Sequence, residues 1–201
     1  MHEQQLFQWI FMGILVVTFA ISASFRRRAR QLGGTIPRAQ EGGFILGLRF
    51  LVAAPLYLSL LAYMINPAWM AWSMVSLPIG LRWLGAGVGL AMLPLLYWLL
   101  RSIGNNISET FLTKDNHTLV THGPYRWVRH PLYTVATVIF VALSLVAANW
   151  FMLAMAALLI FVIAFFVIPK EETQLALKFG DAYRLYQQRT GRLLPRLSPS
   201  R

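Results

Sequence analysis

The sequence predicts an all-α integral membrane protein with about five transmembrane helices, a cytoplasmic loop and a helical C-terminal tail. Three observations support this fold class. Of the 201 residues, 57% are hydrophobic and only 12% are charged, whereas soluble domains carry about 25% charged residues. The apolar residues gather in five long runs, and the basic residues gather between alternate runs. A net charge of +11 can attract nucleic acid, but basic residues that flank apolar runs favour membrane lipid as partner and exclude nucleic acid.

Each apolar run approaches the roughly 20 residues that a helix needs to cross a hydrocarbon core of about 30 Å. Lipid cannot hydrogen-bond backbone groups, so each run must be helical. The first run follows a segment without Lys or Arg and is longer than the apolar core of a signal peptide, so we expect a retained span. Asn149 separates the last two runs, which predicts a helical hairpin. The runs are Leu6–Phe25, Phe44–Met64, Trp83–Leu100, Leu132–Ala148 and Trp150–Ile168.

The basic residues predict the orientation in the membrane. With five spans, the segment after the first span, the connector before the fourth and the tail share one side, and together they hold 16 of the 18 Lys and Arg residues. The loop 65–81 on the opposite side holds none. The positive-inside rule therefore places the N-terminus outside, and the connector and tail in the cytoplasm. Arg49 and Arg82 lie near the ends of runs, where we expect them to snorkel to the headgroups, with a substrate contact as the alternative.

Two pairs of glycines have the four-residue spacing that is typical of closely packed membrane helices. One pair is Gly43 and Gly47, and the other is Gly85 and Gly89. The second pair is not a dinucleotide-binding loop, because no strand precedes it. We therefore expect both pairs to lie at helix–helix contacts.

The connector ends in a segment rich in basic and aromatic residues, His122-Gly123-Pro124-Tyr125-Arg126-Trp127-Val128-Arg129-His130-Pro131-Leu132-Tyr133. Gly123-Pro124 interrupts any helix, and Pro131 requires an extended residue before the next helix starts. The acidic pair Glu171-Glu172 follows the fifth run. Because the last two runs form a hairpin, Pro131 and Glu171 should emerge on the same membrane face. The basic segment and the acidic pair can therefore meet.

Residue types alone leave two interpretations of this region open. Arg126, Arg129 and the neighbouring aromatic residues could be interfacial anchors with the glutamates as ion-pair partners, or the groups could form a binding site. A metal site is not expected, because the spacing of His117, His122 and His130 matches no helical ligand pair and the chain has no cysteine.

The segment Leu119–Tyr133 resembles the hallmark loop of isoprenylcysteine carboxyl methyltransferases and the related phospholipid methyltransferases. The hydrophobic hairpin, Glu171-Glu172, Phe179-Gly180-Asp181-Ala182-Tyr183, Tyr186 and Pro195 follow in the family's order. The resemblance covers about half of the chain and divides it in two. Residues 1–100 hold three transmembrane helices as scaffold and acceptor route, and residues 101–201 hold the methyltransferase core with its connector loop, hairpin and cytoplasmic tail.

The resemblance implies that the loop and the tail fold over S-adenosylmethionine at the cytoplasmic membrane surface. Glu171 or Glu172 would bind the ammonium group of the cofactor, and Asn105 is a further candidate for the same pocket. For catalysis, Arg129 and Arg192 are candidate clamps for an acceptor carboxylate, and Glu172 is a candidate for proton removal. The loop residues implied in cofactor binding are His122, Gly123, Pro124, Tyr125, Arg129, His130, Pro131 and Tyr133.

The function implied is methyl transfer from S-adenosylmethionine to a lipophilic acceptor, with carboxyl O-methylation of an isoprenylcysteine-like substrate expected first. A phospholipid amine and a small thiol are the alternative acceptors. Two interpretations from other classes are a small membrane transporter and a noncatalytic scaffold. Charged residues in mid-span or paired interrupted helices would favour the transporter interpretation, and the central runs lack both. Binding of S-adenosylmethionine would distinguish an enzyme from both.

Overall fold

The computed structural model describes residues 2–33, 43–106 and 118–196. These residues form seven α-helices and several shorter helical turns, with isolated bridges in place of any β-sheet. The α-helices are α1 (His2–Gly33), α2 (Gly43–Ile65), α3 (Ile79–Ile103), α4 (Pro131–Ala147), α5 (Trp150–Val162), α6 (Ile168–Phe179) and α7 (Asp181–Arg189). The 3-10 helices are η2 (Pro67–Ser73), η3 (Gly104–Asn106) and η4 (Gly123–Arg126), and η5 (Ile163–Val167) is a π-helix.

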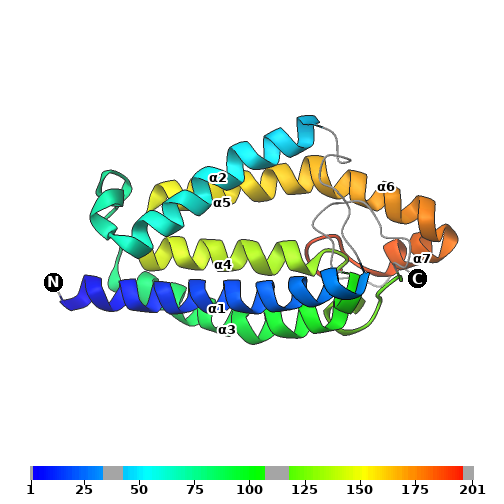
Figure 1. The fold of residues 1–201 in the computed structure, drawn as a ribbon, viewed down its shortest axis with the longest axis horizontal. Helices are drawn as coiled ribbons and strands as arrows, with labels where there is room; N and C mark the ends of the chain where they lie inside the picture. The colour runs from blue at the N-terminus through cyan, green and yellow to red at the C-terminus, as the bar shows by residue number, and fades with distance from the viewer. Residues whose placement is uncertain (1, 34–42, 107–117, 197–201) are drawn as a thin grey trace.

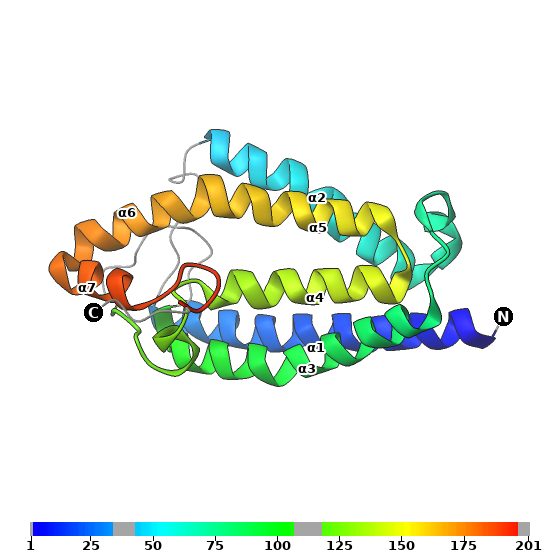
Figure 2. The ribbon, with the colours of Figure 1, turned by 180° about the vertical axis from the view of Figure 1, so that it is seen from behind.

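The long helices form an elongated bundle in which successive helices run antiparallel (Figure 1). Helices α1, α3 and α4 lie side by side, and α2 lies along α5 (Figures 1 and 2). Helices α6 and α7 lie at one end of the bundle, which we name the tail end. The start of α1 and η2 lie at the opposite end, which we name the far end. The hairpin of α4 and α5 therefore returns the chain to the tail end, as the sequence predicts.

Four helices are long and apolar enough to span a membrane: Glu3–Gln31, Gly43–Ile65, Ile79–Ile103 and Trp150–Phe179. They correspond to the first, second, third and fifth predicted runs. The fourth run is α4, which is apolar but has only 17 residues, or about 26 Å of helix. The chain is thus an all-α integral membrane protein, and a count of five spans stays a prediction.

The last long helix continues well beyond the predicted end of the fifth run at Ile168, since α5, η5 and α6 are continuous through Phe179. Pro169 has no backbone N–H to donate, and the wider turn of η5 directly before it accommodates this loss. A 30-residue helix is about 45 Å long, which exceeds a hydrocarbon core of about 30 Å. Its charged end, with Glu171 and Glu172, therefore projects past the apolar part of the bundle.

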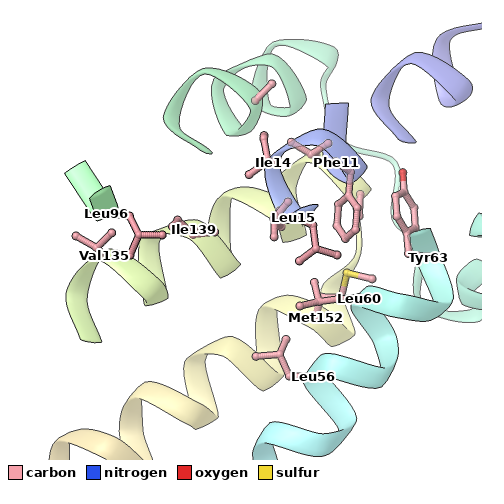
Figure 3. Close-up of a cluster of buried hydrophobic side chains, with 14 of the residues drawn as sticks. Phe11, Ile14, Leu15, Leu56, Leu60, Tyr63, Leu96, Val135, Ile139 and Met152 are labelled. Carbon is pink, nitrogen blue, oxygen red and sulfur yellow. The ribbon is translucent and has the colours of Figure 1, made fainter. Parts of the chain in front are cut away.

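A buried apolar core joins the helices. Phe11, Ile14 and Leu15 of α1 lie near Leu60 and Tyr63 of α2, with residues of α3, α4 and α5 around them (Figure 3). Many large apolar side chains on the outside of the bundle are exposed, as expected where lipid is the solvent. The core thus connects α1, α3 and α4 with α2 and α5.

The helix–helix contacts expected at the two glycine pairs form at one pair and not at the other. A Cβ at Gly85 would lie 2.8 Å from Ala142 O, and one at Gly89 would lie 2.9 Å from Ile14 Cδ1. The close packing expected of this pair is confirmed. The expectation for Gly43 and Gly47 is wrong, because none of the described helices comes within 4 Å of a Cβ added at either residue. The spacing alone does not say whether a glycine face meets another helix.

Arg82 links three helices at the far end. Its Nε and Nη2 donate to Val146 O of α4 at 3.0 and 2.9 Å, and Nη2 also donates to Gln4 Oε1 of α1 at 3.0 Å. The guanidinium carbon lies 3.9 Å from the centre of the Phe7 ring. Arg82 therefore links α1, α3 and α4 at this end of the bundle, and the two roles expected for it stay predictions.

Candidate functional site

The loop before α4 begins at a glycine that no other residue can replace without strain. Gly123 has a φ of 59°, and a Cβ there would lie 2.5 Å from Ser102 Oγ at the end of α3. His122 precedes it with an extended backbone and an exposed side chain. Pro124 and Tyr125 are buried in η4. The glycine thus lets the loop pack on α3, with Tyr125 turned inward.

The segment that follows α7 pairs with this loop through its backbone. Gly191 N donates to Trp127 O at 3.2 Å, and Arg129 N donates to Gly191 O at 2.9 Å. His130 N donates to Arg192 O at 3.1 Å. A Cβ at Gly191 would lie 1.7 Å from a backbone oxygen three residues later, so the turn that starts here needs glycine. Gly191 was not among the predicted site residues, although a lone glycine after an amphipathic helix signals a tight turn.

Glu172 is the centre of a charged cluster between α6 and the loop. Its Oε1 accepts a hydrogen bond from Arg129 Nε at 2.8 Å and lies 3.2 Å from His130 Nε2. Its Oε2 lies 3.8 Å from Arg192 Nε. The side chains of His130, Arg129 and Glu172 are only 3%, 10% and 15% exposed. The hairpin therefore brings the basic segment and the acidic pair together, as the sequence predicts.

Glu171 contacts the same histidine from the other side. Its Oε2 accepts a hydrogen bond from the Tyr133 hydroxyl at 3.0 Å and lies 3.6 Å from His130 Nδ1. The rings of His130 and Tyr133 are stacked, with centroids 5.9 Å apart. The imidazole thus bridges the two neighbouring carboxylates and fixes their separation.

Two further contacts attach α7 to the loop. Arg129 Nη1 donates to Gln187 O at 3.1 Å and to Thr190 O at 2.5 Å, which satisfies carbonyl groups at the C-terminal end of α7. The Tyr186 hydroxyl donates to Tyr125 O at 2.5 Å, and burial raises the pKa of Tyr186 to about 12. Arg129 therefore joins the loop to α7 and to Glu172 through its hydrogen bonds.

Polar atoms without a partner are concentrated at this site. Among the described residues, four buried side-chain nitrogen or oxygen atoms make no hydrogen bond, and three of them belong to Tyr125, Tyr183 and Arg192. Burial, and after it the charge of Glu171, raises the pKa of Tyr125. Burial, and after it the charge of Glu172, raises the pKa of Tyr183. Both phenols therefore lie within electrostatic range of the acidic pair, and each hydroxyl is able to form a hydrogen bond with a ligand.

Two residues of the loop face outward instead. Trp127 is exposed, and the guanidinium carbon of Arg126 lies 3.9 Å from the centre of its ring. Trp98 of α3 packs edge-on against Trp127 with centroids 6.1 Å apart. Trp and Arg in such positions are typical interfacial anchors. The anchor interpretation thus suits Arg126 and Trp127, whereas Tyr125 and Arg129 point into the cluster.

The predicted site residues fall into four groups. Gly123, Pro124 and Pro131 shape the backbone, and His122 is exposed at the start of η4. Asn105 lies in η3, but its side chain is outside the described part of the structure, whereas Asn106 beside it donates to Thr118 O at 3.0 Å. The side chains that the structure brings together are those of Tyr125, Arg129, His130, Tyr133, Glu171, Glu172 and Arg192.

Tyr183 and Tyr186 were not among the predicted site residues, although both are buried against the loop or the acidic pair. Their three-residue spacing places both on the same face of α7, a signal that could have found them. In residues 2–33, 43–106 and 118–196, no group of three or more His, Asp or Glu side chains is arranged to hold a metal ion. His117 lies outside these ranges.

Comparison with known proteins finds one family match. The model of the family described as Phospholipid methyltransferase matches residues 75–182, which is more than half of the chain. The match includes α3, which the expected division at residue 100 assigns to the first part of the chain. It also includes the loop, the hairpin and the acidic pair, and ends within α7 before Arg192. No curated protein matches the chain.

Proposed function

Since the chain belongs to the phospholipid methyltransferase family, we propose that it transfers a methyl group from S-adenosylmethionine to a lipophilic acceptor that reaches the site from the bilayer. Membership makes the protein a membrane methyltransferase. The cofactor, the acceptor and the roles of individual residues belong to the proposal. We also propose that the tail end faces the cytoplasm, because the basic segments lie there.

The observation that carries the proposal is the set of unpartnered polar atoms around the acidic pair. The hydroxyls of Tyr125 and Tyr183 and Nε of Arg192 are buried without hydrogen bonds. Both phenols lie within electrostatic range of the acidic pair, and Arg192 Nε lies 3.8 Å from Glu172 Oε2. A cluster that served only to hold helices together would be expected to satisfy its own buried groups. Buried donors and acceptors that make no hydrogen bond among the described residues indicate a polar ligand.

The chemistry of this set fits the amino-acid half of S-adenosylmethionine. A carboxylate of the pair can accept hydrogen bonds from the ammonium group, and Arg192 can pair with the carboxylate of the cofactor. The phenol rings of Tyr125 and Tyr183 offer aromatic faces, which attract a sulfonium cation. We assign Glu171 to the ammonium group, because Glu172 already binds Arg129 and His130. Arg129 then acts as a positioning residue.

When bound, S-adenosylmethionine supplies an electrophilic methyl group on a sulfonium sulfur. A lone pair of the acceptor forms the new bond to the methyl carbon, while the carbon–sulfur bond breaks and its electron pair stays on sulfur. The protein needs no covalent nucleophile, so its residues contribute by aligning and desolvating the two reactants. Burial of His130 and Arg129 is consistent with a site that excludes water.

Three acceptor classes stay in the proposal. An isoprenylcysteine-like carboxylate needs no proton removal and would pair with a cation at the site. The loop resemblance and the basic character of the site favour this acceptor. A phospholipid amine is favoured by the description of the matched family and would have to lose a proton, for which Glu172 and His130 are the available groups. A small thiol would need the same proton removal.

The decisive experiment is calorimetry of S-adenosylmethionine binding to the purified protein in detergent. We expect saturable binding to the wild type and a 10- to 150-fold weaker affinity for Glu171→Gln, because a hydrogen bond to a charged group contributes about 1.5–3 kcal/mol. Glu3→Gln is a matched control, because Glu3 lies at the far end of α1. A wild type that binds no cofactor would favour a transporter or a noncatalytic scaffold, and an unchanged affinity for Glu171→Gln would remove Glu171 from the pocket.

A further inference from the structure

The first turns of α2 lie against the long helix that carries the acidic pair. Ile45 is buried in a small cluster with Val167 of η5, and Tyr133 and Ile163 pack against this cluster. Tyr133 also donates its hydroxyl hydrogen bond to Glu171. Figures 1 and 2 show the start of α2 beside the junction of α5 and α6. One face of α2 therefore borders the acidic pair.

Arg49 lies on that face. It follows Ile45 by four residues, or about one helical turn, so the two side chains project from the same side of α2. Its residue is half-buried, and its guanidinium lies within electrostatic range of the Glu171 carboxylate. Because α2 runs from the tail end towards the far end, Arg49 lies about one turn deeper along the bundle than Ile45.

The surroundings of Arg49 are apolar and open to lipid. Phe44, Phe50 and Leu51 on the same stretch of α2 are 75%, 72% and 69% exposed. A cation in an apolar span is costly, and such residues usually serve function. Arg82, the other charge within a predicted span, has a structural explanation in its bonds to Val146 and Gln4. The charge of Arg49 acts on Glu171 of the acidic pair.

The cations around the acidic pair thus lie on two sides. Arg129 and Arg192 approach from the loop and the segment after α7, where the proposed cofactor groups are bound. Arg49 approaches from α2, next to exposed apolar side chains. A lipophilic acceptor whose chains lie along those side chains would bring its polar headgroup to this cation.

We propose that Arg49 binds the anionic group of the acceptor headgroup, a phosphodiester or a carboxylate, while the acyl or prenyl chains lie along the exposed face of α2. This inference rests on the proposed methyl transfer and names the acceptor as an anionic lipid. In a phospholipid, the bound phosphodiester would hold the headgroup amine beside the acidic pair. In a prenylated cysteine, the bound group would be the reacting carboxylate itself.

The first test measures lipid binding without turnover. Equilibrium binding of short-chain phosphatidylethanolamine and of an uncharged diacylglycerol of equal chain length is compared in neutral detergent for wild type, Arg49→Leu, Arg49→Lys and Trp9→Leu. We expect Arg49→Leu to lose about tenfold or more in affinity for the phospholipid and to bind the diacylglycerol as the wild type does. Arg49→Lys should recover part of the loss, and Trp9→Leu, which changes an exposed aromatic residue of α1 away from this surface, should show none. Equal phospholipid affinity in wild type and Arg49→Leu would overturn the inference.

The second test separates the two anionic sources by kinetics. If the phosphodiester is bound, Arg49→Leu should raise KM for phosphatidylethanolamine with little change in kcat. If a carboxylate is bound, the same variant should lower kcat/KM for a prenylated cysteine. Cofactor affinity is measured in parallel. A loss of cofactor affinity as large as the loss of acceptor affinity would overturn the inference by assigning Arg49 to the cofactor. A wild type without cofactor binding would overturn the proposed function but not the result of the lipid-binding test.

Discussion

The two ends of the bundle each contain a partly buried arginine cluster, and they differ in how completely their polar groups are satisfied. At the far end, Arg82 donates to Val146 and Gln4 and stacks on Phe7, and no acidic side chain takes part in these contacts. At the tail end, Arg129, Arg192 and His130 surround Glu171 and Glu172, and three buried polar atoms make no hydrogen bond. A satisfied cluster stabilises the fold, whereas an unsatisfied one indicates a ligand.

The largest effect is expected for Arg129→Met, which removes the guanidinium that joins the loop, α6 and α7. Glu172 would lose its shortest ion pair, and the Gln187 and Thr190 carbonyls would lose their donor. We expect the free energy of unfolding to fall by about 3 kcal/mol and S-adenosylmethionine binding to be lost. Thermal unfolding in detergent and calorimetry measure the two effects. A stable variant with normal binding would contradict the positioning role of Arg129.

An intermediate effect, on stability alone, is expected for Arg82→Met. The variant loses charge-assisted hydrogen bonds to Val146 O and Gln4, each of the kind that contributes about 1.5–3 kcal/mol. We expect a loss of about 2 kcal/mol in the free energy of unfolding, with cofactor affinity in the folded protein within twofold of wild type. If cofactor affinity fell together with stability, the two ends would be coupled and the comparison would break down.

The smallest effect is expected for Arg192→Gln. Because Arg192 Nε has no hydrogen bond and lies 3.8 Å from the nearest glutamate oxygen, its removal should leave the unfolding temperature nearly unchanged. Cofactor affinity should fall about tenfold, since the variant would lack the cation for the cofactor carboxylate. A loss of cofactor affinity without a loss of stability would distinguish Arg192 at the tail end from Arg82 at the far end. A drop in stability with unchanged affinity would make Arg192 a structural residue like Arg82.

Features that depend on composition and on chain reversal could be predicted from the sequence. The apolar runs follow from hydropathy, and the meeting of Arg129 and Glu172 follows from the hairpin that returns the chain to its starting face. The tight turn at Asn149 was predicted for the same reason, and its side chain accepts a hydrogen bond from Met152 N. These inferences need only the direction of successive helices.

Features that depend on which backbones approach each other could not be predicted. The partners of Arg82 lie 64 and 78 positions away in the chain, and no periodicity connects them. Gly191 needs its lack of a side chain because of a turn that only the folded tail forms. The π-helix η5 carries α5 into α6 at Pro169, where sequence alone suggested that the span ends. The open position of Gly43 and Gly47 likewise depends on packing that their spacing does not encode.

The pairing of the loop with the segment after α7 has a consequence for biosynthesis. The backbone of Arg129 and His130 is held by carbonyl groups of Gly191 and Arg192, which the ribosome adds only after every apolar helix has been made. Membrane insertion and assembly of the site are therefore separate events in time. A chain interrupted after Arg189 would contain α1 to α7 but would lack the carbonyl groups that hold the backbone of Arg129 and His130.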